Sequence, residues 1–326
     1  MTDRQPLISI IIPIFNKQKY VEKCLESLFD QTYTNIEVIV VDDCSTDSSH
    51  SKVNKILNGR PGCRVLSNDR NMGHLNSRYV GIDNSSGEYI TFMDADDWME
   101  PDAIHVMVEA MSDFDADLVQ IRNQRRMKGI AVKYREKFSP ELAGRLIEGE
   151  EFRSIASYVG MDSYIFPACW GKLYRADRLR EMQRIDFKQF WGEDQIFNIQ
   201  YLRECKSMVF CDYVGYNYRW GGQTTAIYKY SALKEYKHVH HLKRMLGQDR
   251  NHIDAEINML LRYHVRSLIT ELGYTREAVE MIMKEELRDP IWKTAGMTES
   301  ASELVEEAVG RIQRSPMKYL AKRLLK

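Results

Sequence analysis

The first half of the chain alternates between short apolar runs and longer segments in which apolar residues recur every three or four positions. Residues 7–14 (LISIIIPI) and 36–41 (IEVIVV) are apolar runs rich in β-branched residues. Runs of this length and composition predict strands that are buried on both faces. Residues 17–31, which lie between them, have the apolar spacing of an amphipathic helix.

The alternation continues further along the chain. Short apolar runs predict strands at residues 63–66, 88–93 and 118–122, and residues 73–82 are predicted to form a helix between the first two of these strands. Strands that alternate with helices indicate a largely parallel sheet with helices on its faces. Residues 123–150 are weakly patterned, so loops or edge strands are expected there.

Polar side chains follow three of the predicted strands at the point where each strand ends. Asn16 follows the first strand, Asp42 and Asp43 follow the second, and the acidic residues 94–97 follow the fourth. In parallel sheets flanked by helices, ligands bind beyond the carboxyl ends of the strands. The sequence therefore predicts a ligand site at this edge of the sheet.

The most concentrated of these polar clusters is residues 94–97, which read Asp-Ala-Asp-Asp. Three carboxylates so close together repel one another and raise each other's pKa values unless a cation neutralises them. Carboxylate oxygens suit Mg²⁺ or Mn²⁺, and these ions in turn bind diphosphate oxygens. Taken alone, the cluster is equally compatible with an exposed acidic helix cap.

Composition narrows the class of protein. The chain has 326 residues, of which 44% are hydrophobic and 29% are charged, values typical of a soluble globular protein with one large domain and an appendage. Its net charge of −1 argues against a nucleic-acid partner held by a global basic surface. No run approaches the ~18–20 apolar residues of a membrane span, and the N-terminal segment does not resemble a signal peptide.

The six cysteines contain no CxxC pair and match no zinc or redox motif. Scattered cysteines of this kind predict reduced thiols and a cytoplasmic location. Residues 311–326 carry six basic side chains and no acidic one. This basic tail fits either peripheral contact with the anionic inner face of a membrane or a solvated helix on its own domain.

Ordered motifs along the first 225 residues resemble the family 2 inverting glycosyltransferases, which adopt the α/β GT-A fold with a Rossmann-like mixed sheet. The motifs are, in chain order, residues 9–16 (SIIIPIFN), 39–47 (IVVDDCSTD), 71–73 (NMG), Arg78, 87–90 (GEYI) and 94–97 (DADD). Cys44 stands where the family usually has Gly or Asn. The resemblance implies a GT-A domain over residues 1–225, followed by a helical C-terminal region over residues 226–326.

Within this domain, the resemblance implies a donor half over about residues 1–100. The residues that would hold the nucleotide-sugar donor are Pro13, Ile14, Phe15, Asp43, Asn71, Arg78, Asp94 and, from further along, Arg219. Asp43 would accept from the uracil ring, and Arg78 would lie near the diphosphate, where a fixed cation suits phosphate oxygens. Asp96 would ligate Mn²⁺ or Mg²⁺ directly, and Asp94 would face the ribose and this metal. Alternatively, Asn71 only shapes a turn and Arg78 forms a structural ion pair.

The acceptor half, over about residues 101–225, contains a second motif. Residues 191–197 (WGEDQIF) resemble the family's acidic acceptor motif at the start of a predicted helix. This implies that Asp194 is the catalytic base, which takes the proton of the acceptor hydroxyl, and that Glu193 orients it or touches the metal. Both could instead stabilise a helix N-terminus through its dipole. Trp170 and Trp191 are expected to contact the acceptor, with a core position as the alternative for Trp170.

These features predict an inverting, metal-dependent glycosyltransferase that moves a hexosyl or N-acetylhexosaminyl group from a UDP-sugar. The resemblance implies an acceptor hydroxyl on a bacterial surface glycan, a lipid-linked glycan or a glycoprotein. One alternative is a nucleotidyltransferase, although such enzymes have a glycine-rich loop after the first strand and this chain does not. The other is a nucleotide-sugar-binding protein that has lost catalysis.

Overall fold

A computed structural model describes residues 5–127, 130–132, 139–157, 165, 167–184 and 193–219. The chain divides into two compact units, Met1–Glu235 and Tyr236–Lys326, and the described residues all belong to the first. The predicted domain boundary near residue 225, the helical region 226–326 and the basic tail lie outside the described residues. No helix among the described residues is both long enough and apolar enough to cross a bilayer.

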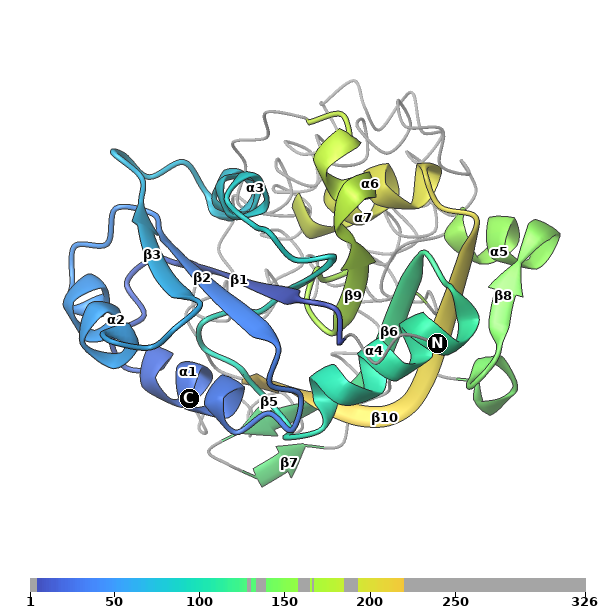
Figure 1. Cartoon of the computed structure of the whole chain (residues 1–326), viewed down its shortest axis with the longest axis horizontal. Coiled ribbons are helices and arrows are strands. Elements are labelled where there is room, and N and C mark those ends of the chain that lie inside the picture. The colour runs from blue at the N-terminus through green and yellow to red at the C-terminus, as the bar shows by residue number, and fades with distance from the viewer. Residues whose placement is uncertain are drawn as a thin grey trace, which may run out of the picture. The chain divides into compact units, whose positions relative to one another are not determined.

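The described part of the chain is built on a mixed sheet with the strand order β3-β2-β1-β4-β9-β6-β10-β5, in which β7 pairs with β6 and β8 with β10 (Figure 1). The strands are β1 (Ile8–Ile14), β2 (Ile36–Asp42), β3 (Cys63–Ser67), β4 (Tyr89–Phe92), β5 (Trp98–Met99), β6 (Leu118–Met127), β7 (Ile130–Val132), β8 (Leu146–Glu148), β9 (Lys172–Arg175) and β10 (Ser207–Arg219). The helices are α1 (Val21–Phe29), α2 (Ser49–Leu57), α3 (His74–Asp83), α4 (Ala103–Phe114), α5 (Gly149–Ala156), α6 (Ala176–Glu181) and α7 (Glu193–Arg203), with a 3₁₀ turn at Pro140–Leu142.

Strand direction explains where a ligand can bind. Strands β3, β2, β1 and β4 are mutually parallel, and β9 runs antiparallel between β4 and β6. Strand β10 is parallel to β6. The carboxyl ends of β1, β2, β4, β6 and β10 therefore all lie at one edge of the sheet, which is the edge predicted from the sequence.

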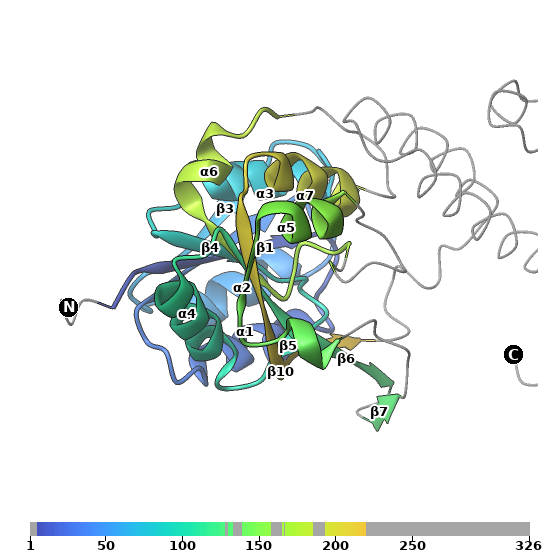
Figure 2. The same cartoon turned by 90° about the vertical axis from the view of Figure 1, so that its right-hand side faces the viewer.

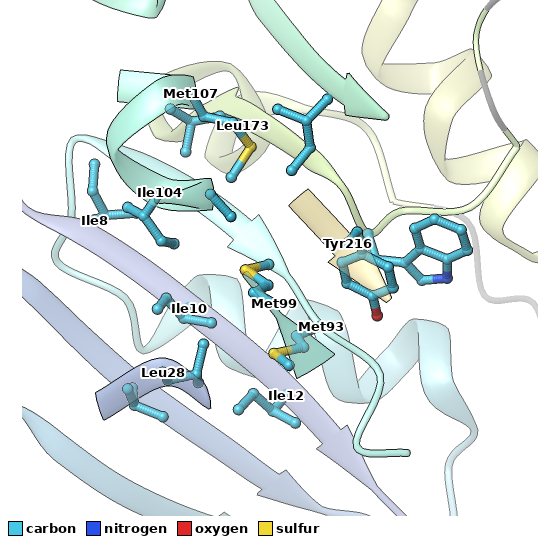
Figure 3. Packing of buried hydrophobic residues seen from close by; sticks show 14 of the residues in the cluster. Ile8, Ile10, Ile12, Leu28, Met93, Met99, Ile104, Met107, Leu173 and Tyr216 are labelled. Atoms are coloured by element: carbon cyan, nitrogen blue, oxygen red, sulfur yellow. The ribbon is translucent and has the colours of Figure 1, made fainter. Parts of the chain in front are cut away.

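Helices cover both faces of the sheet, with α1, α2 and α4 on one side and α3, α6 and α7 on the other (Figure 2). The apolar run of β1 is buried on both faces for this reason. Ile8, Ile10 and Ile12 pack in one core cluster with Leu28 of α1 and with residues of α4 such as Ile104 (Figure 3). Since successive side chains of a strand point to opposite faces, the intervening residues of β1 face the second helical layer.

The second layer approaches β1 very closely at one point. A Cβ atom added to Gly81 of α3 would lie 2.3 Å from Cγ2 of Ile11 and 3.2 Å from its Cγ1. Only a residue without a side chain allows α3 to lie this near the strand. The position of α3, and of every functional side chain it carries, therefore depends on this contact.

The opposite end of the sheet from the predicted site is held by a buried carboxylate. Glu37 of β2 accepts hydrogen bonds from Ser9 Oγ at 2.6 Å, Ser86 N at 2.6 Å and Gly87 N at 3.1 Å, and it pairs with Arg64 at 3.0 Å. Burial alone would raise the pKa of Glu37, but the hydrogen bonds from Ser9 and Ser86 bring it below its usual value. The carboxylate thus joins β1, β2 and the turn before β4.

The predicted strands and helices of the first 122 residues are confirmed, with shifts of a few residues at their ends. The weakly patterned residues 123–150 contain the end of β6 and the short edge strands β7 and β8, as expected. Strand β10 was not predicted. It is long and rich in tyrosine, and of its residues only Arg219 was interpreted from the sequence, as a contact of the donor.

We expect Gly81→Ala to destabilise the fold by about 1–3 kcal/mol, because the new methyl group must displace Ile11 or α3. The gain in helix propensity, about 1 kcal/mol, offsets only part of this effect. The free energies of unfolding of Gly81→Ala, Ile11→Ala and the double variant, measured in denaturant, give the coupling energy between the two positions. Ile11→Ala should cost less in the Gly81→Ala background than in the wild type. A Gly81→Ala protein as stable as the wild type would contradict this packing argument.

Candidate active site

The loops that follow β1 and β2 are joined by hydrogen bonds at the carboxyl edge of the sheet. Asn16 adopts a left-handed conformation (φ 54°), which asparagine tolerates better than most residues. Its Oδ1 accepts hydrogen bonds from Thr46 N at 2.8 Å and Asp47 N at 3.2 Å. The next backbone amide, that of Lys17, donates to Ser49 Oγ at 2.6 Å. The first predicted polar cluster is therefore bound directly to the loop that follows the second.

Asp43 is the most constrained of the predicted donor residues. Its carboxylate accepts from the backbone amides of Met72 and Gly73 and from Asn68 Nδ2, each at 2.8 Å. Three of the roughly four lone-pair positions of the carboxylate are thus occupied, which leaves one for a ring N–H. Asp43 is 1% exposed, so a uracil ring would contact only the edge of this carboxylate.

Other residues predicted to bind the donor lie around this carboxylate. Pro13 and Ile14 are buried at the end of β1, and Ile14 O accepts a hydrogen bond from Asp43 N at 2.8 Å. Phe15 is partly exposed in the loop that follows. Asn71 is exposed on the approach to α3. The structure therefore brings these predicted donor-binding residues close to Asp43, and Asn71 is the one exposed to solvent.

The acidic cluster after β4 forms a turn in which Asp97 N donates to Asp94 O at 3.0 Å. The Asp97 carboxylate accepts from Tyr216 Oη at 2.8 Å and from Arg219 N at 2.7 Å, and burial, followed by the charge of Asp96, raises its pKa well above the usual range. Asp97 thus anchors the turn to β10.

The predicted metal ligand Asp96 faces a cation of the protein itself. Lys17 Nζ lies 2.9 Å from Asp96 Oδ2, and the two side chains are only 6% and 11% exposed. The backbone oxygen of Asp96 accepts from Arg219 Nε at 2.6 Å. Arg219 therefore lies beside the acidic turn, where its guanidinium is 5.1 Å from the rings of both Tyr20 and Trp98.

Arg78 links the two acidic motifs. From α3, its Nη1 donates to Asp194 Oδ1 at 2.5 Å and its Nη2 to Asp94 Oδ1 at 3.4 Å. The Arg78 side chain is 2% exposed, whereas those of Asp94 and Asp194 are about a quarter exposed, at 24% and 25%. The structural ion pair considered as an alternative for Arg78 is therefore present, and it joins the donor-side and acceptor-side carboxylates.

The two carboxylates at the start of α7 differ in their surroundings. Asp194 accepts from Arg78 and from the buried thiol of Cys169, whose Sγ lies 3.4 Å from Oδ1. Burial, followed by the charge of Asp194, raises the pKa of the neighbouring Glu193 to about 8. Asp194, in contrast, is ion-paired with the Arg78 guanidinium at 2.5 Å.

Of the two tryptophans predicted to contact an acceptor, the structure describes only Trp170. Trp170 is 5% exposed, and its ring stacks on Tyr216 with a centroid distance of 4.3 Å and on Tyr218 at 5.7 Å. This burial favours the core position that was the alternative for Trp170. Trp191 lies outside the described residues.

The fit of a divalent cation can be tested on the charges of the site. Burial raises the pKa of Asp94 to about 6, and the like charges of Asp194 and Asp96 add to this shift against the opposing effect of Arg78. A further cation beside Asp94 and Asp96 would relieve this repulsion. No group of three or more His, Cys, Asp or Glu side chains suited to a metal occurs in the described part of the chain. Two carboxylates with substrate phosphates are nevertheless a usual Mg²⁺ or Mn²⁺ environment.

Sequence reasoning missed three residues of this site. Lys17, Cys169 and Tyr216 contact the acidic side chains directly. Lys17 could have been found, because it directly follows Asn16 at the edge where the polar clusters meet. The other two reach the site only through the pairing of β9 and β10 within the sheet, which the apolar pattern did not indicate.

A sequence profile of glycosyl transferase family 2 matches residues 9–177, just over half of the chain. Glycosyltransferase GlyA of Streptococcus pneumoniae is 30% identical over 213 residues, which cover 65% of this chain and 30% of GlyA. Hyaluronan synthase of Pasteurella multocida is 34% identical over 107 residues, which cover 33% of this chain and 11% of the synthase. The chain thus spans less than a third of the length of either relative.

Among solved structures, S. aureus TarS 1-349 in complex with UDP-GlcNAc is similar with a TM-score of 0.61 and 20% identity, over 95% of this chain and 91% of that chain. The same protein in complex with UDP gives a TM-score of 0.58 at 19% identity, over the same shares of the two chains. Similarity at this level of identity establishes the fold, and it confirms the mixed α/β GT-A architecture expected from the sequence.

The raised pKa of Glu193 predicts a particular pH dependence of stability. The unfolded chain loses this proton near pH 4.5 and the folded chain near pH 8, so the folded state binds more protons in between. Stability should therefore fall as pH rises through this window, by at most about 1.4 kcal/mol per pH unit. Glu193→Gln removes this effect, so its melting temperature relative to wild type should increase from about pH 5 to about pH 8.

The measurement is thermal unfolding in EDTA, with Glu150→Gln as the control variant. Glu150 lies exposed on α5 and pairs with Arg153. A melting-temperature difference between Glu193→Gln and wild type that stays constant with pH would show that Glu193 titrates normally.

Proposed function

This chain belongs to glycosyl transferase family 2 and is a glycosyltransferase, and we propose that it transfers one sugar from a UDP-linked donor to an acceptor hydroxyl with inversion at the anomeric carbon. The observation that carries this proposal is the Arg78 guanidinium, which binds Asp94 after β4 and Asp194 at the start of α7. It brings the carboxylate assigned to the donor side and the carboxylate assigned as catalytic base into one ion-paired group.

A UDP-sugar is the donor that the site supports best. The TarS structures with UDP-GlcNAc and with UDP share this fold. In this chain, Asp43 retains one free acceptor position beside Pro13, Ile14 and Phe15, which suits the ring N–H of uracil. The diphosphate would then extend toward Lys17 and the acidic turn, because both lie at the same edge of the sheet.

Asp194 is proposed as the catalytic base. An inverting transfer needs a group that takes the proton of the acceptor hydroxyl as its oxygen attacks the anomeric carbon. The Arg78 guanidinium binds Asp194 and fixes its orientation, while the raised pKa of Glu193 leaves that side chain largely protonated at neutral pH. Glu193 would thus lie next to the catalytic base without competing with it for the proton of the acceptor hydroxyl.

Asp94 and Asp96 are the residues that would hold Mn²⁺ or Mg²⁺ together with the diphosphate. When bound, the ion offsets the charge that develops on the departing nucleoside diphosphate. Arg219, whose guanidinium lies beside the turn, would contribute a second positive charge near that leaving group. Asp97 would hold the turn in place through its bonds to β10.

The proposed acceptor is a hydroxyl of a bacterial surface glycan, a lipid-linked glycan or a glycoprotein. The similarity to hyaluronan synthase, a polysaccharide-forming enzyme by name, supports a glycan acceptor. The predicted acceptor contact Trp191 would lie next to the Glu193–Asp194 pair in sequence. Peripheral membrane contact through the basic tail remains part of this proposal, because a lipid-linked acceptor would place the enzyme at a membrane.

The first test is release of UDP from a panel of UDP-sugars with Mn²⁺ and again with EDTA. We expect release from one sugar, dependent on the metal, and a loss of about 10²- to 10⁴-fold in Asp194→Asn, because the base is removed. Calorimetric binding of UDP with Mn²⁺ should be unchanged in this variant. A wild type that binds UDP but never turns over would favour a binding protein that has lost catalysis. Failure to bind UDP would overturn the Asp43 assignment.

A second test separates two roles for Arg78. Arg78→Lys keeps the charge but loses one of the two hydrogen bonds, each worth about 1.5–3 kcal/mol with a charged partner. If Arg78 orients Asp194, kcat should fall about 10- to 100-fold with UDP affinity unchanged. If Arg78 contacts the diphosphate, as first expected from the sequence, UDP affinity should fall instead. Arg180→Lys, on the exposed part of α6, is the matched control.

A further inference from the structure

Lys17 is a buried cation for which the family resemblance provides no role. Its side chain is 6% exposed, and its ammonium lies 2.9 Å from Asp96 Oδ2. Lysine is almost never buried to this extent unless it is paired. The partner here is the residue assigned as the direct metal ligand, so the ammonium lies where a divalent cation would be expected.

The backbone at Lys17 is held by hydrogen bonds that fix the point from which its side chain extends. Its amide donates to Ser49 Oγ at 2.6 Å, and its carbonyl accepts from Val21 N at 3.1 Å at the start of α1. The preceding Asn16 binds the loop after β2 through Thr46. These bonds fix the starting point of the side chain, which then reaches Asp96 across the gap between two loops.

Burial determines what happens when this pair is separated. Removing one partner of a buried ion pair leaves an uncompensated charge, which is far more unfavourable than the intact pair is favourable. A metal ion that takes Asp96 would leave the Lys17 ammonium without an anion. A metal ion that arrives with a nucleoside diphosphate would bring a new anion for Lys17 at the same time.

We propose that Lys17 occupies the position of the divalent cation on Asp96 and thereby makes metal binding depend on the nucleotide diphosphate. This inference rests on the proposed UDP-sugar donor and metal. In the absence of nucleotide, the ammonium competes with the metal for the carboxylate. When the diphosphate is present, Lys17 transfers its contact to the phosphate oxygens and Asp96 becomes available to the metal.

The proposal requires a coupling free energy between the metal and the nucleotide. Coupling of this kind is reciprocal, and ordinary couplings change affinity about 5- to 150-fold. Replacing Lys17 by a neutral side chain removes the competitor. The metal should then bind more tightly in the absence of nucleotide, and the nucleotide should increase the metal affinity by a smaller factor. A lysine that only stabilised the fold would leave this coupling unchanged.

The test is titration of the full-length protein with Mn²⁺, following free Mn²⁺ by electron paramagnetic resonance, with and without UDP. Lys17→Met and Lys17→Gln should bind Mn²⁺ alone at least about fivefold more tightly than wild type, and the tightening caused by UDP should shrink by the same factor. Lys19→Met is the matched control, because Lys19 is an exposed lysine of the same loop. It should behave as wild type. Circular dichroism melts verify that both Lys17 variants are folded.

Two other results have distinct meanings. If the Lys17 variants bind Mn²⁺ alone no more tightly than wild type, while UDP still strengthens Mn²⁺ binding, Lys17 does not compete with the metal and this inference is overturned. If UDP binds but Mn²⁺ binds to none of the proteins, even with UDP, the metal dependence in the proposed function fails and this inference fails with it.

Discussion

The crowding of negative charge at one edge of the sheet is the constraint on which the rest of the site depends. Carboxylates from the turn after β4 and from the start of α7 come together where little water screens them. Two buried cations make this arrangement possible, because Arg78 pairs with Asp94 and Asp194 and Lys17 pairs with Asp96. The fourth carboxylate, on Asp97, is held by hydrogen bonds from β10. Each of these four acidic side chains is thus held by a partner from an element or loop other than its own.

Much of the fold could be predicted from the sequence, because local pattern and burial agree along the first half of the chain. Buried parallel strands such as β1 and β2 have apolar runs that no other element explains as well. Strand β10 was missed for a physical reason. It lies next to the end of the strand order, and after the short apolar run 208–211 it mixes the partly exposed Tyr213 and Tyr218 with the buried Tyr216 and Asn217, so its sequence has neither a long apolar run nor a clean alternation.

The sequence predicted which residues gather at the carboxyl edge better than it predicted how they contact one another. The strand-end rule and the family motifs located Asp43 and Asp96, whose roles toward a donor and a metal stay predictions. The contact of Arg78 with Asp194 joins residues 116 positions apart, and no local pattern encodes such a distance. Lys17 was overlooked because a lysine beside a loop is ordinarily a solvated surface residue.

The two cations reach the site from opposite sides of the sheet. Arg78 is carried by α3, which is pressed against one face of β1 at Gly81, whereas Lys17 leads into α1, which packs on the other face. Both counter-charges are therefore present only when both helical layers are docked. The two sets of ion pairs thus tie the helical layers of both faces to the same edge of the sheet, so a disturbance in either layer reaches the same group of carboxylates.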